Sequence, residues 1–279
     1  MDFLTEPALD RPAPGWSHDL PKPSDTPSAH PCSRLIFNFP NHMDEIYLEL
    51  PRSTVRTRGI MVWLAISLTL VGIVDLYMIL HYAVSSQNIK FLILLILIIT
   101  VFILVYSVGL IWRLDTTPPR DEPIRFNRAR RKVYVYRFHY AALRPFSRKA
   151  WFTRAEVYDW ADLRAEACSI YGPMGSGGLV ETVSLAVVRP GTNEVLDRFH
   201  FAHGGLQGEM YWALAQIYMQ QGPEALPKFD RPPRDWNNEK ITFNLARHLA
   251  PKVKWPEAID LESRTAPDQT PQAALSGHS

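Results

Sequence analysis

The chain has 279 residues and a formal net charge of only +2 at pH 7. It therefore lacks the global basic field that nucleic-acid binding prefers, and we expect no nucleic-acid partner. The two cysteines, Cys32 and Cys168, lie far apart in the sequence and predict neither a disulfide framework nor a zinc site.

The residues before the first apolar segment divide into two parts. Residues 1–33 hold seven prolines among polar residues, which predicts a disordered, Pro-rich tail. Within residues 34–58, "RLIFNF" (34–39) and "EIYLEL" (45–50) have the composition of short strands. Since a lone hairpin is marginal in water, we expect these strands to dock on a folded region elsewhere in the chain.

Two long apolar runs follow. From Ile60 to Tyr82 the chain runs for 23 residues with Asp75 as its only formal charge, and from Phe91 to Trp112 it runs for 22 residues with none. About 20 helical residues cross a hydrocarbon core about 30 Å thick. We therefore expect transmembrane helices at 59–82 and 91–112, joined into a hairpin by a turn at 83–90.

The positive residues predict the orientation of this hairpin, because lysine and arginine resist translocation. Three arginines lie between residues 52 and 58 and seven basic residues lie between 113 and 132, whereas the turn holds only Lys90. Both termini are therefore expected in the cytoplasm, with the turn on the outer face.

Small and polar residues inside the spans indicate helix contacts. Gly72 and Asp75 share one side of the first span, and Thr100 and Ser107, seven residues apart, share one side of the second. We expect Asp75 to form hydrogen bonds within the hairpin or between copies in a homo-oligomer. A proton or ion relay is the alternative, but transport pathways need more helices and more ionisable groups. Replacing Asp75 with leucine should weaken insertion or assembly.

Residues 120–227 have the size and pattern of one cytoplasmic domain. Period-two or β-branched patterns predict strands at 132–139, 164–171, 181–188 and 194–201. Helical spacing follows from Leu206 to Ile217 and ends at Gly222 and Pro223. The predicted fold is α+β: a transmembrane hairpin followed by a small antiparallel sheet or barrel capped by a helix.

Five stretches carry a resemblance to a known family. They are "LELPRSTVRTRG", "EPIRFNRARRKVYVYR", "YDWADLRAE", the strand pair after it, and a helix ending "YMQQGPEALP". Together they resemble an uncharacterised bacterial family in which a transmembrane hairpin precedes a cytoplasmic domain, over roughly residues 34–227. The resemblance implies a bacterial inner-membrane protein with two spans. The cytoplasmic portion also resembles pleckstrin-homology-like domains.

The resemblance carries a functional expectation. Family members are often encoded near type VI secretion effectors, which implies an accessory, adaptor or immunity role toward a secreted toxin or a secretion component. No catalytic residues are described for the family, and the sequence contains no nucleophile elbow, metalloprotease helix or phosphate loop. We therefore expect no enzyme activity, cofactor or metal.

One charged segment and one histidine pair remain as candidate sites. The basic run of Arg125, Arg128, Arg130, Arg131 and Lys132 could bind anionic membrane lipids, or it could only fix topology and solubilise a turn. His200 and His203 follow a strand alternation that places them on opposite faces unless the chain turns, so solvent-facing histidines are expected and not a metal site.

Residues 228–279 form the predicted C-terminal tail. Apolar residues at helical spacing between 239 and 250 predict a short helix that packs on the domain or binds a partner. Two functions therefore remain open. The first is a non-enzymatic, membrane-tethered partner of a secretion effector, and the second is a lipid-binding or scaffolding module unrelated to secretion.

Overall fold

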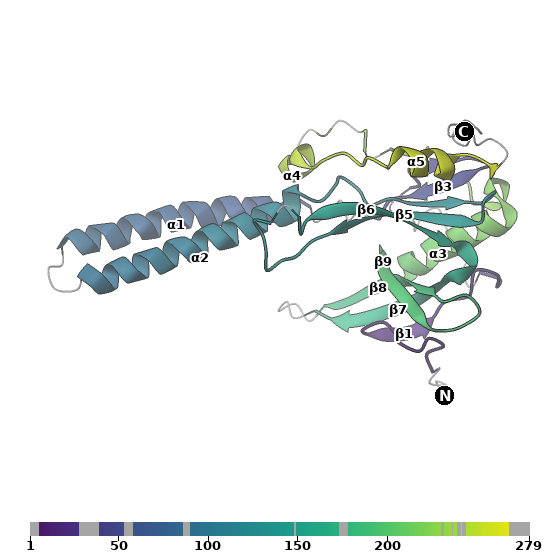
Figure 1. Ribbon diagram of the computed structural model, residues 1–279, viewed down its shortest axis with the longest axis horizontal. Coiled ribbons are helices and arrows are strands. Elements are labelled where there is room, and N and C mark those ends of the chain that lie inside the picture. Colours follow the sequence, from purple (N-terminus) through teal and green to yellow (C-terminus); the bar gives the residue numbers. More distant parts are fainter. Residues whose placement is uncertain are drawn as a thin grey trace, which may run out of the picture.

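The computed structural model describes residues 6–27, 39–52, 58–85, 90–147, 149–172, 178–229, 232–235, 237–238, 241 and 244–267. In these residues two long helices run side by side away from a folded region that contains two antiparallel β-sheets (Figure 1). The chain is therefore a mixed α/β protein, as the predicted α+β class requires.

Helix α1 spans Ile60–Ser85 and helix α2 spans Lys90–Thr116. Both are long and apolar enough to cross a membrane, which confirms the two apolar helices expected from the sequence. Most of their apolar side chains are exposed, unlike those of a helix in a protein core. Of the predicted turn, residues 86–89 lie outside the described residues.

The two helices approach each other closely at Gly72. A Cβ atom added to Gly72 would lie 2.3 Å from Leu104 Cδ2, so a larger residue would require the Leu104 side chain to shift. The contact face of α1 passes through Ala65, Gly72 and Leu76. Asp75 lies about 100° around the helix from Leu76, and its side chain is exposed.

The four residues predicted to form helix contacts do not all lie between the two helices. Gly72 lies between the helices, and Thr100 and Ser107 are half-buried. Asp75 is exposed and lies to the side of the contact face, so its position does not favour a hydrogen bond within the hairpin. Contact between copies through Asp75 stays a prediction.

The first sheet has five strands in the order β2-β3-β4-β5-β6. Their bounds are His42–Met43, Tyr47–Leu50, Ile124–Asn127, Lys132–His139 and Phe152–Asp159. Strand β3 pairs with β4, with Leu48 opposite Phe126, so residues before the helices complete a sheet formed after them. The strand expected at 34–39 lies outside the described residues, except for Phe39, which is in no strand.

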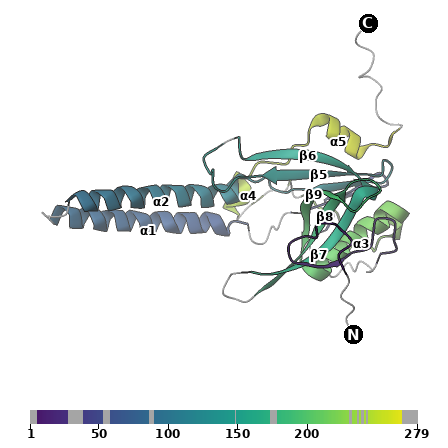
Figure 2. The same ribbon diagram turned by 60° about the horizontal axis from the view of Figure 1, so that its bottom comes forward.

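The second sheet has four strands in the order β1-β7-β8-β9. Their bounds are Trp16–Asp19, Leu163–Tyr171, Leu179–Val188 and Val195–His203. Helix α3 (Gly205–Gln221) packs against β7, β8 and β9, and a single core lies between α3 and the two sheets (Figure 2). The sheets do not close into a barrel within the described residues.

The first 33 residues contradict the prediction of a disordered tail wherever the structure describes them. Strand β1 pairs with β7, and Leu9, Ala13 and Leu20 are buried. Residues 1–5 and 28–33 lie outside the described residues. The prediction was wrong because it relied on the proline content. Scattered apolar residues of this segment pack against the folded region and are buried there.

Side chains of α3 hold the proline-rich segment in place. Trp212 Nε1 donates to the carbonyl of Pro21 at 2.8 Å, and Gln216 Nε2 donates to the carbonyl of Lys22 at 2.7 Å. Gln220 Nε2 donates to the carbonyl of Pro23 at 2.8 Å. Proline lacks an N–H but retains a carbonyl acceptor, so a row of side-chain donors suits such a segment.

The C-terminal region contains two helices, α4 (Leu245–Leu249) and α5 (Glu257–Arg264). Helix α4 lies within the helix predicted at 239–250, of which residues 239–240 and 242–243 lie outside the described residues, and α5 was not predicted. Helix α5 lies over β4 and β5 on the face of the first sheet that is turned away from the core (Figure 1). The described part of this region is thus a second layer on the sheet and not a tail.

Candidate functional site

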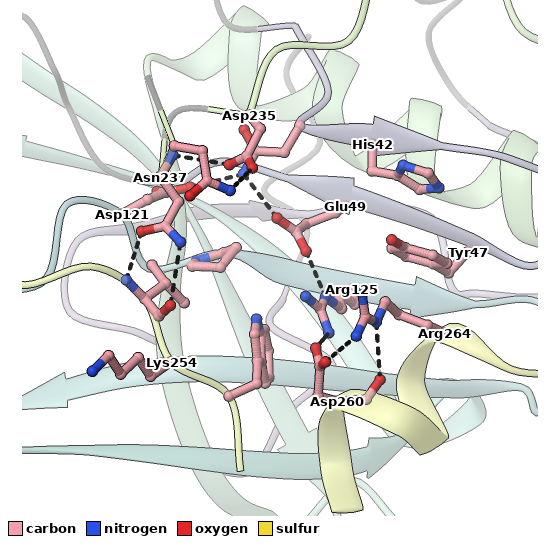
Figure 3. A pocket seen from close by; sticks show the side chains of 15 residues that line it. His42, Tyr47, Glu49, Asp121, Arg125, Asp235, Asn237, Lys254, Asp260 and Arg264 are labelled. Carbon is pink, nitrogen blue, oxygen red and sulfur yellow. Dashed lines mark hydrogen bonds and ion pairs between the residues drawn. The ribbon is translucent and has the colours of Figure 1, made fainter. Parts of the chain in front are cut away.

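A cavity lies between the first sheet and the C-terminal region. Its volume is about 560 Å³, and three distant segments of the chain line it (Figure 3). The first is β2 and β3, the second is the start of β4, and the third runs from Asp235 to Arg264. We call this cavity the polar pocket.

The alternation of β3 and β4 explains the chemistry of the pocket wall. Successive side chains of a strand point to opposite faces of the sheet. One set is apolar and lies in the core: Leu48, Leu50, Ile124 and Phe126. The other set is polar or aromatic and faces the C-terminal region: Tyr47, Glu49, Arg125 and Asn127.

Arg125 is the centre of this wall. Its side chain is 8% exposed, and it pairs with Glu49 through Nε and with Asp260 through Nη1, the latter at 2.7 Å. Its guanidinium carbon also lies 4.4 Å from the centre of the Trp255 ring. Burial opposes the charge, but the two carboxylates outweigh it and raise the pKa of Arg125 above its usual value. Arg125 is therefore a fixed cation that joins the sheet to the C-terminal region.

Asn41 and Asp121 form a second buried polar group in the wall. Asn41 Nδ2 donates to Asp121 Oδ2 at 3.0 Å and to Glu49 Oε1 at 3.1 Å. The Asn41 side-chain carbonyl oxygen is buried and has no hydrogen-bond partner among the described residues. A buried acceptor without a partner is costly in a protein interior, and it commonly marks a place for a water molecule or a ligand group.

The mouth of the pocket carries charges of both signs. Lys254 is exposed and its amino group has no partner among the described residues, and Asp235 and Arg264 also line the pocket (Figure 3). Asn237 fixes this rim to the rest of the chain through reciprocal bonds with the backbone of Val253, at 2.7 and 3.2 Å. The pocket therefore offers donors, acceptors and both charge signs to a polar ligand.

A comparison with known protein families identifies the family of this chain. A family model described as "Family of unknown function (DUF6708)" matches residues 98–267. The chain belongs to this family. The comparisons with curated proteins and with solved structures found no match. The DUF6708 match includes Arg125 and the C-terminal side of the pocket, whereas β2 and β3 precede it.

The basic run lies within the DUF6708 match. Most of its side chains bind other parts of the same chain. Arg130 Nε donates to the carbonyl of Thr265 at 2.9 Å, and Lys132 pairs with Glu262 at 3.1 Å. Arg131 Nη1 donates to the carbonyl of Met219 at 2.6 Å. With Arg125 in the pocket wall, these residues fasten α5 and α3 to the sheet, and Arg128 lies beside them near the end of α3.

The position of the run also argues against binding at the membrane surface. Residues 128–131 form the turn between β4 and β5, at the end of these strands that is remote from α2 (Figure 1). The opposite end of β5 leads into the loop that contacts α2. Sequence reasoning could place this run near the membrane only by counting residues, because the direction of β4 is a tertiary property.

His200 and His203 do not lie on opposite faces of the sheet; His203 is exposed, as expected, and His200 is half-buried. The pairing of β8 with β9 shifts between Val183 and Ser184, so Phe201 is an extra residue in β9. This bulge brings the two imidazole rings to the same side, with centroids 4.1 Å apart. Burial lowers the pKa of both, that of His200 to about 3. The residues that the structure describes contain no cluster of three or more metal-binding side chains.

No local pattern in the sequence predicts the polar pocket. Tyr47, Glu49 and Arg125 alternate with core residues, which is also the pattern of a solvent-facing side of an antiparallel sheet. The segment that covers this face contributes Trp255 and Asp260, more than a hundred residues after Arg125.

Proposed function

We propose that this DUF6708 protein is a non-enzymatic, membrane-anchored binding protein that receives a segment of a partner protein in the polar pocket. The α1–α2 hairpin anchors it in a bacterial inner membrane, with both termini and the folded region in the cytoplasm. The resemblance described above makes a type VI secretion effector the expected partner, in an adaptor or immunity role.

The observation that most supports this proposal is the composition of the pocket. It combines a buried unpaired acceptor on Asn41, an aromatic wall at Trp255 and charges of both signs at the mouth. A simple anion or cation would be served by one sign of charge, whereas a peptide segment presents amide donors, amide acceptors and side chains of both signs. The pocket therefore suits a peptide best.

The fold supports the same proposal. Two antiparallel sheets enclose one core, and a helix follows the last strand and packs on them. We interpret this as a pleckstrin-homology-like arrangement, a shape that serves peptide and lipid binding alike. The lipid alternative through the basic run is less favoured, because Arg130, Arg131 and Lys132 already bind the chain itself.

The test is co-purification of the full-length protein from native membranes, comparing Lys254→Glu with Lys228→Glu. Both lysines are exposed, but only Lys254 lines the pocket. Reversal of the charge at Lys254 leaves a mostly acidic rim and should weaken partner binding by about 1 kcal/mol, roughly fivefold. The Lys228 variant should bind as the wild type does.

Three results would overturn the proposal. Equal recovery of the effector with both variants would remove the pocket from the binding site. Recovery of a partner that dissociates when lipid is removed would favour the scaffolding alternative. Release of the protein from membranes by alkaline carbonate would exclude the anchor.

A further inference from the structure

The loop between β5 and β6 is fastened to the last turns of α2. The Phe146 ring packs edge-on against the Tyr106 ring, with centroids 6.4 Å apart. A Cβ atom added to Gly109 would lie 2.9 Å from the same Phe146 ring. Arg113 donates a hydrogen bond to the carbonyl of Pro145, and its guanidinium carbon lies 4.6 Å from the centre of the Trp151 ring.

The contacts on α2 fix the depth of this loop relative to the span. Trp63 and Trp112 are exposed near the ends of the two helices that join the folded region, where tryptophan is enriched at membrane interfaces. Gly109 and Tyr106 lie deeper than Trp112, by about 4.5 and 9 Å at 1.5 Å per residue. The headgroup region of one leaflet is only about 5–7 Å thick. Phe146 therefore lies at the level where headgroups meet acyl chains.

The same loop exposes an unusual amount of apolar surface. Leu143 is 88% exposed, and Tyr140, Phe146 and Phe152 are exposed around it. The exposed cations Arg144 and Lys149 flank these side chains. Contiguous apolar patches with a polar rim mark interaction surfaces, and aromatic residues beside cations are typical of a surface that enters a lipid interface.

A second hairpin end also exposes apolar side chains and has the same direction, although no cations flank it. Ile170, Tyr171, Leu179 and Val180 are exposed where β7 ends and β8 begins, and Tyr171 is 77% exposed. In both views these strand ends extend from the folded region toward the side of α1 and α2 (Figures 1 and 2). The opposite ends of the strands, where β8 turns into β9, lie on the far side of the domain.

We propose that these two hairpin ends, residues 140–147 and 149–152 and the ends of β7 and β8, insert into the headgroup–acyl boundary of an anionic cytoplasmic leaflet. The insertion rests on the membrane anchoring proposed above. It transfers the apolar side chains from water to lipid, and Arg144 and Lys149 beside the β5–β6 loop meet anionic headgroups. Two insertions beside a two-helix anchor hold the domain in one orientation on the bilayer.

The experiment places a fluorescent nitrobenzoxadiazole label on single cysteines of the full-length protein in nanodiscs of anionic lipid. Cys32→Ser and Cys168→Ala provide the background, and the labelled variants are Leu143→Cys, Tyr171→Cys and Leu196→Cys. Leu196 is the matched control, because it is also exposed but lies at the far end of β9. Labels at 143 and 171 should show blue-shifted emission and loss of fluorescence with lipids that carry a nitroxide near the headgroup. The label at 196 should show neither.

The outcomes separate insertion from anchoring. Equal spectra and equal quenching at 143, 171 and 196 in fully incorporated protein would overturn the insertion and leave the anchor intact. Quenching at 143 alone would restrict the proposal to the β5–β6 loop and overturn it for the second hairpin. Failure of the unlabelled protein to enter nanodiscs would overturn the anchor itself.

Discussion

His200 lies at a junction of the two sheets. The Arg52 side chain donates to the carbonyls of His200, Tyr136 and Glu122 at 2.6 to 2.7 Å, so its cation lies beside the imidazole. His200 Nε2 is buried without a hydrogen-bond partner in the part of the chain that the structure describes. Burial, then the neighbouring His203, then Arg52 lower the pKa of His200 to about 3.

This shift predicts a loss of stability in mild acid. Unfolded His200 takes up a proton as the pH falls through its usual pKa of 6.5, whereas folded His200 stays neutral until about pH 3. Between these two pH values the unfolded state binds more protons than the folded state. The free energy of unfolding therefore decreases as the pH decreases, by up to about 1.4 kcal/mol per pH unit. His203, whose pKa is also lowered, adds to the slope.

Thermal unfolding of the detergent-solubilised protein between pH 7 and pH 5 measures this effect. The variant His200→Gln should flatten the dependence of Tm on pH. A control replaces the exposed His248 with glutamine and should keep the wild-type slope. Identical slopes for wild type and His200→Gln would show that His200 is accessible to protons in the folded state.

At the scale of the element, helix α5 and the residues after it are attached to the first sheet by side chains of β4 and of the turn that follows it. Asn127 is fully buried, and its amide donates to the carbonyls of Ser263 and Thr265 at the end of α5, at 3.0 and 3.1 Å. Carbonyl groups at the C-terminal end of a helix have no N–H donor within the helix, so the Asn127 amide supplies one. Arg130 adds a bond to the carbonyl of Ala266 at 3.1 Å.

Replacing Asn127 with alanine should therefore release α5. The lost hydrogen bonds leave buried carbonyls without donors, at a cost of about 1–3 kcal/mol to the docking of this element. Limited trypsin digestion should cut after Lys252 and Lys254 faster than in the wild type. Arg154→Ala, on the exposed side of β6, is the control. An unchanged rate at the two lysines would mean that other contacts alone hold the region.

Prediction from the sequence succeeded for elements whose pattern is local. The two apolar helices, β5, β7, β8 and β9 follow from composition or period over a single segment. It failed where a segment gains its structure from distant partners. Strand β1 depends on its pairing with β7, and α5 depends on Asn127 and Arg125, which lie far from it in the sequence.

At the scale of the whole molecule, segments before and after the apolar hairpin form one folded region together. Strand β3 precedes α1 and pairs with β4 after α2, and Asp115 at the end of α2 accepts hydrogen bonds from Gly59 and Val62 at the start of α1. Arg58 binds the carbonyls of Pro118 and Pro119. The base of the hairpin is therefore continuous with the folded region. An anchored hairpin would fix where the domain and its polar pocket lie.

The most direct test of the central claim, a hairpin in the membrane with the folded region inside the cell, is thiol labelling in intact cells. Single cysteines replace Gln87, between the two helices, and Leu196, on the folded region, in the background without Cys32 and Cys168. A membrane-impermeant maleimide should label position 87 in intact cells and position 196 only after permeabilisation. Labelling of position 196 in intact cells, or of neither position until permeabilisation, would contradict the account.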